Sequence, residues 1–115
     1  MVGIRDPARQ FSESSEKMTI NQASREYILC DWPRASRDPR GFPVEFAFLA
    51  SGETIDDAVW NSGSWEPSAI KPYTARVLVG PNATVTLSPG TYTVICRITT
   101  DEEQPVRNVG ILTVD

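Results

Sequence analysis

The feature that most constrains the fold is a recurrence of short segments in which apolar and polar residues alternate. The clearest is LSPGTYTVICRITT, residues 87–100, where Tyr92, Val94 and Cys96 share one side and the intervening residues share the other. This is the period of a β-strand, because successive side chains point to opposite faces of a sheet. Similar segments recur at roughly ten-residue spacing with Pro, Gly, Asn or Asp between them, which is typical of a β-sandwich or barrel.

The alternation predicts about seven or eight short strands and almost no helix. Nine prolines would interrupt most helices, and GETIDDAV, residues 52–59, could form one helical turn at most. The expected strands cover residues 17–20, 25–32, 42–51, 57–65, 73–80, 83–88, 92–99 and 106–114.

Two packed sheets need bulky residues that point inward. The candidates for this core are Ile28, Trp32, Phe46, Phe48, Trp60, Val77, Val79, Val85, Leu87, Tyr92, Val94, Cys96, Ile98, Ile111 and Val114.

With 115 residues the chain has the length of one domain. Residues 1–17 are polar and show no periodicity, so we predict an extended N-terminal arm followed by one domain over residues 18–115. Such an arm needs a surface to lie on, either the domain itself or a partner.

Composition narrows the classes of function. The net charge of −4 disfavours non-specific binding to nucleic acid, which needs a basic surface. No apolar run reaches the length of a membrane-spanning helix, and the N-terminus lacks the apolar centre of a secretory signal. We therefore expect a protein that is made and kept in a cytoplasm and that contacts neither nucleic acid nor membrane.

The residue inventory offers little for catalysis. The chain has no histidine, which removes the commonest general base and metal ligand. The acidic pairs at residues 56–57 and 101–103 lack the spacing of a calcium loop and are expected to be solvated turns. We expect no enzyme, no metal site and no cofactor.

Cys30 and Cys96 both fall in strand-like, apolar segments. They could be two buried thiols that act as small hydrophobes, or one disulfide that joins two sheets. A reducing cytoplasm favours free thiols.

Two groups of residues are candidate partner-binding sites. Arg34, Arg37 and Arg40 lie in one loop, where they could bind an acidic partner through paired guanidinium contacts or could simply be solvated. Trp60 and Trp65 flank the break at Gly63, and an exposed tryptophan would anchor an interface. With Tyr73, these tryptophans could alternatively form a platform for stacking sugars.

A turn of Ser88, Pro89 and Gly90 leads into the strand that Tyr92 opens. This resembles the tyrosine corner of immunoglobulin-like domains, in which the tyrosine hydroxyl bonds back to the corner backbone. The alternative is an ordinary hairpin tyrosine. In antibody domains a cysteine follows two residues after the tyrosine, whereas here that position is Val94. The pattern predicts an all-β, immunoglobulin-like β-sandwich of about seven to eight strands with an extended N-terminal arm.

The C-terminal third, VTLSPGTYTVICRITTDEEQPVRNVGILTVD, also resembles a narrower group. It is similar to the end of small immunoglobulin-like virion proteins of tailed bacteriophages, especially those of actinobacterial hosts. DPRGFPVEFAFLASG, residues 38–52, resembles them less specifically. The matching residues are Leu87, Pro89, Gly90, Tyr92, Val94, Arg97, Ile98, Thr99, Pro105, Gly110, Leu112, Thr113 and Val114.

The resemblance implies a non-enzymatic structural role in a virion that is assembled in the host cytoplasm. The first expectation is a capsid accessory or decoration protein that docks on the major capsid lattice in many copies. Two alternatives stay open: a tail or baseplate component, and a bacterial carbohydrate-binding or adhesion module.

Overall fold

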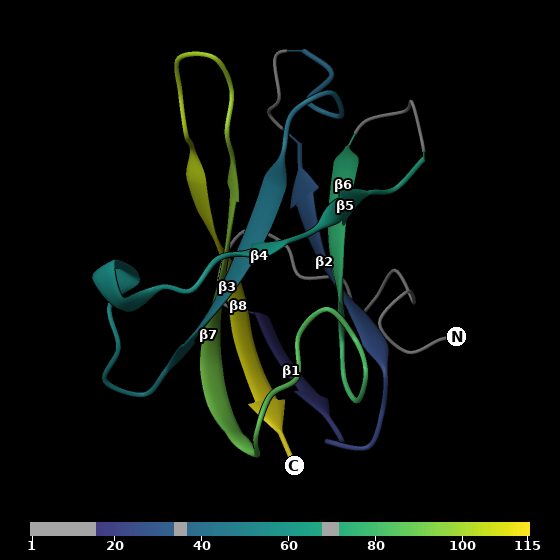
Figure 1. Cartoon of the computed structure of the whole chain (residues 1–115), viewed down its shortest axis with the longest axis vertical. Coiled ribbons are helices and arrows are strands. Elements are labelled where there is room, and N and C mark those ends of the chain that lie inside the picture. The colour runs from purple at the N-terminus through teal and green to yellow at the C-terminus, as the bar shows by residue number, and fades with distance from the viewer. Residues whose placement is uncertain (1–15, 34–36, 68–71) are drawn as a thin grey trace.

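The computed structural model describes residues 16–33, 37–67 and 72–115, and they form two β-sheets that face each other across one core (Figure 1). The prediction of an all-β sandwich is confirmed. The strands of the described residues are β1 Glu16–Ile20, β2 Glu26–Trp32, β3 Val44–Ala50, β4 Asn61–Ser62, β5 Ser64–Trp65, β6 Tyr73–Val79, β7 Gly90–Ile98 and β8 Val106–Val114.

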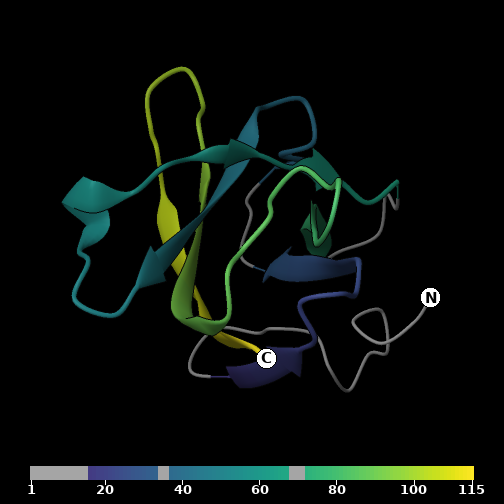
Figure 2. The ribbon, with the colours of Figure 1, turned by 60° about the horizontal axis from the view of Figure 1, so that its bottom comes forward.

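One sheet has five strands in the order β1-β8-β7-β3-β4, and the other has three in the order β2-β6-β5. The pairs are antiparallel except for β1 and β8, which run parallel. β7 lies in the middle of the larger sheet, between β3 and β8. Figure 2 shows β2 and β6 in a layer separate from β3, β7 and β8. β1 begins at Glu16, so the last two residues of the expected arm belong to a strand, and residues 1–15 lie outside the described residues.

The chain crosses from one sheet to the other at Gly63. On its two sides, β4 pairs with β3 in the larger sheet and β5 pairs with β6 in the smaller one. A Cβ atom at Gly63 would lie 2.8 Å from the Arg76 carbonyl oxygen and 2.9 Å from the Phe46 ring. Because a side chain does not fit at this distance, the predicted break at Gly63 is a packing requirement.

The core is built from the inward faces of both sheets. Ile28 and Val77 of the smaller sheet and Phe46 and Val94 of the larger one are almost fully buried. Burying each such side chain stabilises the fold by roughly 1.5–3 kcal/mol before the entropy cost. The other buried members of this core are Met18, Ile20, Leu29, Cys30, Trp32, Val44, Ala75, Val79, Val85, Cys96, Ile98, Val109, Leu112 and Val114.

Two predicted core residues lie elsewhere. On β8, Leu112 pairs with Tyr92 and shares the inward face with Val114, so Leu112 is 0% exposed while Ile111 is only half-buried. Ile111 pairs with Thr93 and points to the other face, because successive side chains of a strand alternate between the two faces. Trp60 packs on a smaller cluster on the outer face of the larger sheet, formed by Ala47, Leu49 and Ile95.

The predicted strand over residues 83–88 is wrong. Only one isolated bridge, between Val79 and Val85, joins this segment to a strand. The backbone turns at Gly80 and at Asn82, where φ is 58°, and the Thr86 hydroxyl donates to the Gly80 carbonyl oxygen at 3.0 Å. The apolar alternation here reflects Val85 and Leu87 packing on the core, without a ladder of backbone hydrogen bonds.

The corner before β7 has the geometry that its sequence predicts. The Tyr92 hydroxyl donates to the Ser88 carbonyl oxygen at 2.7 Å, which is the hydrogen bond that defines a tyrosine corner. Gly90 has φ of 154°, which side-chained residues rarely adopt. The Tyr92 ring packs against the core, so the corner ties the loop to the sheet that it enters.

We expect Tyr92→Phe to lower the free energy of unfolding by about 1 kcal/mol, because it removes one hydrogen bond and keeps the ring. Urea unfolding measures this change. Tyr27→Phe is the control, because no hydrogen bond involves the Tyr27 hydroxyl within the described residues. Equal effects of the two substitutions would show that the corner bond contributes nothing.

Cys30 and Cys96 are free thiols buried in the same core cluster. Burial, followed by the neighbouring Cys30 thiol, raises the pKa of Cys96 well above its usual 9.0. The folded protein therefore holds this proton at a pH where the unfolded chain has released it.

A raised pKa in the folded state stabilises the fold fully below the unfolded value and progressively less above it. With reductant present, we expect the free energy of unfolding to fall as pH rises above 9.0. Cys96→Ala should reduce that slope, because the variant lacks the thiol whose pKa is raised. Urea unfolding from about pH 8 to about pH 10 measures the difference. Equal slopes for the wild type and the variant would contradict the assignment.

Candidate interaction surfaces

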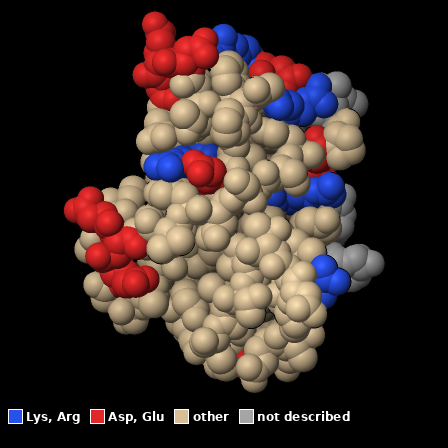
Figure 3. Space-filling view, in the orientation of Figure 1, with Lys and Arg blue, Asp and Glu red and all other residues tan. Residues whose placement is uncertain are grey.

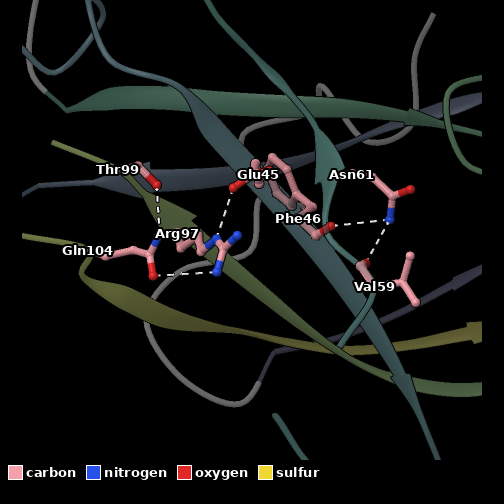
Figure 4. Close-up of polar contacts among 7 residues, drawn as sticks. All are labelled: Glu45, Phe46, Val59, Asn61, Arg97, Thr99 and Gln104. Atoms are coloured by element: carbon pink, nitrogen blue, oxygen red, sulfur yellow. Dashed lines mark hydrogen bonds and ion pairs between the residues drawn. The ribbon is translucent and has the colours of Figure 1, made fainter. Parts of the chain in front are cut away.

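Arg97 connects several elements on the outer face of the larger sheet (Figure 4). From β7 its Nε donates to the Glu45 carboxylate on β3 at 2.9 Å, and its Nη1 donates to Gln104 at 3.4 Å. Gln104 in turn donates to the Thr99 hydroxyl at 3.0 Å. The Arg97 guanidinium also lies 4.0 Å from the centre of the Trp60 ring. This role has no signal in the sequence, because an outward arginine on a strand does not indicate its partners.

The contact between Arg97 and the Trp60 ring holds the C-terminal end of a loop that folds beside the sheet. Ala58 and Trp60 pack on Ala47, Leu49 and Ile95. Asn61 then donates to the Phe46 and Val59 carbonyl oxygens at 3.3 and 3.1 Å (Figure 4). Residues 53–59, here called the 53–59 loop, are therefore held firmly at their C-terminal end.

Internal hydrogen bonds order the 53–59 loop itself. The Glu53 carboxylate accepts from the Ala50 amide at 2.7 Å, and the Asp57 carboxylate accepts from the Thr54 amide at 2.8 Å. Residues 55–57 form one 3₁₀ turn, which agrees with the single helical turn that the sequence allowed. Figure 1 shows this turn standing out at one side of the sandwich.

The 53–59 loop exposes two large apolar side chains. Ile55 is 51% exposed and Val59 is 75% exposed, and the exposed acidic residues Glu53, Asp56 and Asp57 lie in the same loop. Exposed apolar side chains on an ordered frame are a common feature of protein–protein contacts. The sequence predicts only a solvated acidic turn at residues 56–57. It gives no sign that Ile55 and Val59 are exposed, because their exposure depends on how the loop leaves the sheet.

The structure describes two of the three arginines predicted to bind a partner. Arg37 is exposed, and its guanidinium lies 4.8 Å from the centre of the Phe42 ring. Arg40 contacts Asp38 at 2.6 Å and lies over the Tyr73 ring. Hydrogen bonds from Arg40 lower the pKa of Asp38 to about 2. Arg34 lies outside the described residues.

Both described arginines of this loop already contact other side chains, and Arg40 makes more contacts than Arg37. The Arg40 guanidinium forms a paired contact with the Asp38 carboxylate, so an acidic partner would have to compete with a carboxylate in place. Arg37 lies over a ring but has no ion pair among the described residues, so of the two described arginines it is the one that is open to a carboxylate.

The two tryptophans lie on opposite sides of the break at Gly63, as the sequence allowed, and neither is fully exposed. Trp60 packs outside the larger sheet under Arg97, and Trp65 packs against the core and donates to the Phe42 carbonyl oxygen at 3.0 Å. Tyr73 is buried, with 8% exposure. These positions leave no open set of ring faces on which sugars could stack.

Next to the crossing lies a shallow groove of about 250 Å³. Tyr27, Ser64, Arg76 and Thr84 line it, together with Gly63. Arg76 is engaged within it, because it contacts Glu66 at 3.2 Å and lies over the Tyr27 ring. The groove contains no cluster of groups suited to general acid–base chemistry.

Charge is unevenly distributed over the molecule. Figure 3 shows the two largest groups of acidic side chains over the protruding turn and the tip of the β7–β8 connection, and most of the visible basic side chains on the other side. Within residues 16–33, 37–67 and 72–115, no group of three or more potential ligand side chains is placed to hold a metal ion. In the same part of the chain, no helix is long and apolar enough to cross a membrane.

No family model and no curated protein matches this chain.

We expect Arg97→Met to lower the free energy of unfolding by about 1–2 kcal/mol, because it removes a half-buried ion pair and the contact with Trp60 while keeping the aliphatic stem. Urea unfolding measures the loss. Arg25→Met is the control, since Arg25 is exposed and has no ion pair among the described residues. It should change stability by less than about 0.5 kcal/mol. Similar losses in both variants would contradict the bracing role of Arg97.

Proposed function

We propose that this protein is a non-enzymatic structural protein of a bacteriophage virion, most specifically a capsid accessory protein that docks on the major capsid lattice. The observation that carries the proposal is a protruding, internally hydrogen-bonded segment of the sandwich, the 53–59 loop, that exposes Ile55 and Val59. An ordered loop loses little entropy when it binds, so it suits a permanent contact.

The resemblance of the C-terminal third to small virion proteins supports a place in the virion. Its residues form the corner at Tyr92, strand β7, the acidic connection over residues 99–105 and strand β8. These elements build the body of the larger sheet and leave the loops for contact. The same body would serve a tail or baseplate component, which therefore remains the second candidate.

In this proposal, docking combines the burial of two apolar side chains with the repetition of the same contact over the lattice. Ile55 and Val59 would enter an apolar depression on a lattice subunit, and the carboxylates around them would face basic side chains. A contact of this size is weak for one copy. On a lattice, neighbouring sites give many equivalent contacts, and a decoration protein can occupy them at high density without any catalytic group.

The carbohydrate-binding alternative is less favoured. Stacking of sugars needs exposed aromatic faces, whereas Arg97 covers Trp60, Trp65 packs on the core and Tyr73 is buried. Using these rings would require breaking contacts that hold the fold together.

The number of copies per particle tests whether the protein belongs to the virion and whether it lies on the capsid. We expect purified virions to contain this protein in an amount comparable to that of the major capsid protein, as measured by quantitative mass spectrometry. A few copies per particle would move the protein to the tail or baseplate. Its absence from virions would overturn the proposal.

The docking surface is tested separately with empty capsids and purified protein. We expect the double variant Ile55→Ser, Val59→Ser to bind at least about tenfold more weakly in a co-sedimentation assay, because the two side chains are the apolar anchors. Val106→Ser is the matched control, since Val106 is also exposed, at 45%, but lies at the start of β8. Unchanged binding by the double variant with the fold intact would exclude the 53–59 loop as the docking surface.

A further inference from the structure

A row of side chains crosses four strands on the outer face of the larger sheet. Ile95 of β7 belongs to the apolar cluster on this face, and Thr93 lies two residues before it, so Thr93 points to the same side. Thr93 pairs with Ile111 on β8 and with Leu49 on β3. Ile111 in turn pairs with Lys17 on β1. Because residues that pair directly share a face of the sheet, these four side chains lie in one outward row.

The two ends of the row carry opposite charges. Lys17 is exposed and has no ion pair among the described residues. At the other end, β3 stops one residue after Leu49 and the chain enters the 53–59 loop. Figure 1 shows β1 and the turn of this loop on opposite sides of the larger sheet. Asp56 in the loop is exposed and also lacks an ion pair in the described part of the chain, so each end of the row offers a charge to a partner.

Uncharged side chains lie between and beside these charges. Ile111 is half-buried within the row, and Ile55 and Val59 of the 53–59 loop are 51% and 75% exposed. The neighbouring outward positions on β1, β8 and β7 are threonines, namely Thr19, Thr113 and Thr91. An apolar centre with a polar rim is the usual composition of a protein interface, and burying the apolar side chains is favourable.

A face with opposite charges at its two ends is complementary to itself. A half-turn about an axis parallel to the strands brings a second copy face to face with the first and exchanges the two ends of the row. With strands about 4.8 Å apart, an axis midway between β8 and β7 places β1 of each copy over β3 of the other. Lys17 of one copy then lies beside the 53–59 loop of the other, and the symmetry repeats this contact. A second copy therefore satisfies both ends of the row at once.

We propose that the outer face of the larger sheet binds a second copy of this chain in a two-fold dimer. Lys17 of each copy pairs with Asp56 of the other, and β1 and β8 of the other copy cover Ile55 and Val59. The inference concerns the free protein and does not depend on the proposed function. Because a capsid subunit would contact the same 53–59 loop, the second copy must leave before the loop docks.

Sedimentation equilibrium of the whole chain, from about 10 μM to about 1 mM, measures the dissociation constant of the dimer. We expect a reversible equilibrium between monomer and dimer. Lys17→Glu and Asp56→Lys should each raise the dissociation constant at least about tenfold, because two contacts between opposite charges become two contacts between like charges. The double variant Lys17→Glu, Asp56→Lys should return to within about threefold of the wild type, because both pairs are restored with their signs exchanged.

Arg25→Glu is the matched control. It makes the same change of charge as Lys17→Glu at an exposed residue that precedes β2 of the smaller sheet. It should change the dissociation constant by less than about threefold. The substituted side chains are all exposed, and circular dichroism verifies that each variant keeps its fold.

Two results would overturn the dimer. One is a wild-type protein that stays monomeric up to about 1 mM. The other is a double variant that dimerises as weakly as the single variants, because the interface would then not bring Lys17 to Asp56. These measurements involve no capsid, so a failure of the dimer is distinct from a failure of the proposed function.

Discussion

The sharing of one core by two sheets is the constraint on which the rest of the structure depends. The chain must pass between the layers, and it does so at Gly63, where a side chain would collide with the Arg76 backbone and the Phe46 ring. It must also enter the centre of the larger sheet, and there the Tyr92 hydroxyl fixes the corner that precedes β7. Once these two passages are set, the strands have little freedom in how they pair.

The same constraint determines what remains for contact with other molecules. Inward residues fill the core. Outside it, several arginines lie over aromatic rings, among them Arg97 over Trp60 and Arg76 over Tyr27. Side chains that sequence alone offers as binding groups are thereby used to brace the fold. The 53–59 loop differs, because its polar groups are bonded internally while Ile55 and Val59 face solvent.

Much of the fold could be predicted from the sequence, because alternation and turn residues report directly on strands. Local patterns predict the fold class and most strand positions. They also predict the break at Gly63 and the corner at Tyr92. The segment over residues 83–88 alternates equally well but is not a strand, since whether a strand finds a partner is decided by the whole sheet. The bulge between the Val94–Gly110 and Ile95–Asn108 pairs has no local signal either, whereas the two-residue period from Val114 already indicates that Leu112, and not Ile111, faces the core.

The candidate surface was harder to predict than the fold. Exposure of Ile55 and Val59 depends on Trp60 being held against the outer face of the larger sheet, a contact between residues distant in sequence. The arginine loop carried the stronger sequence signal, yet Arg40 is already paired with Asp38 within that loop. Local charge patterns indicate which groups can bind a partner, and the fold decides which of them are available.

The central claim is that a rigid sandwich presents the 53–59 loop in a fixed, binding-ready conformation. Backbone order parameters from NMR relaxation of the free protein test it most directly. The account predicts values of about 0.85 for residues 53–59, as in the strands. Values below about 0.6 there, with the strands remaining rigid, would contradict it, because a loop that moves on this timescale is not pre-ordered for docking.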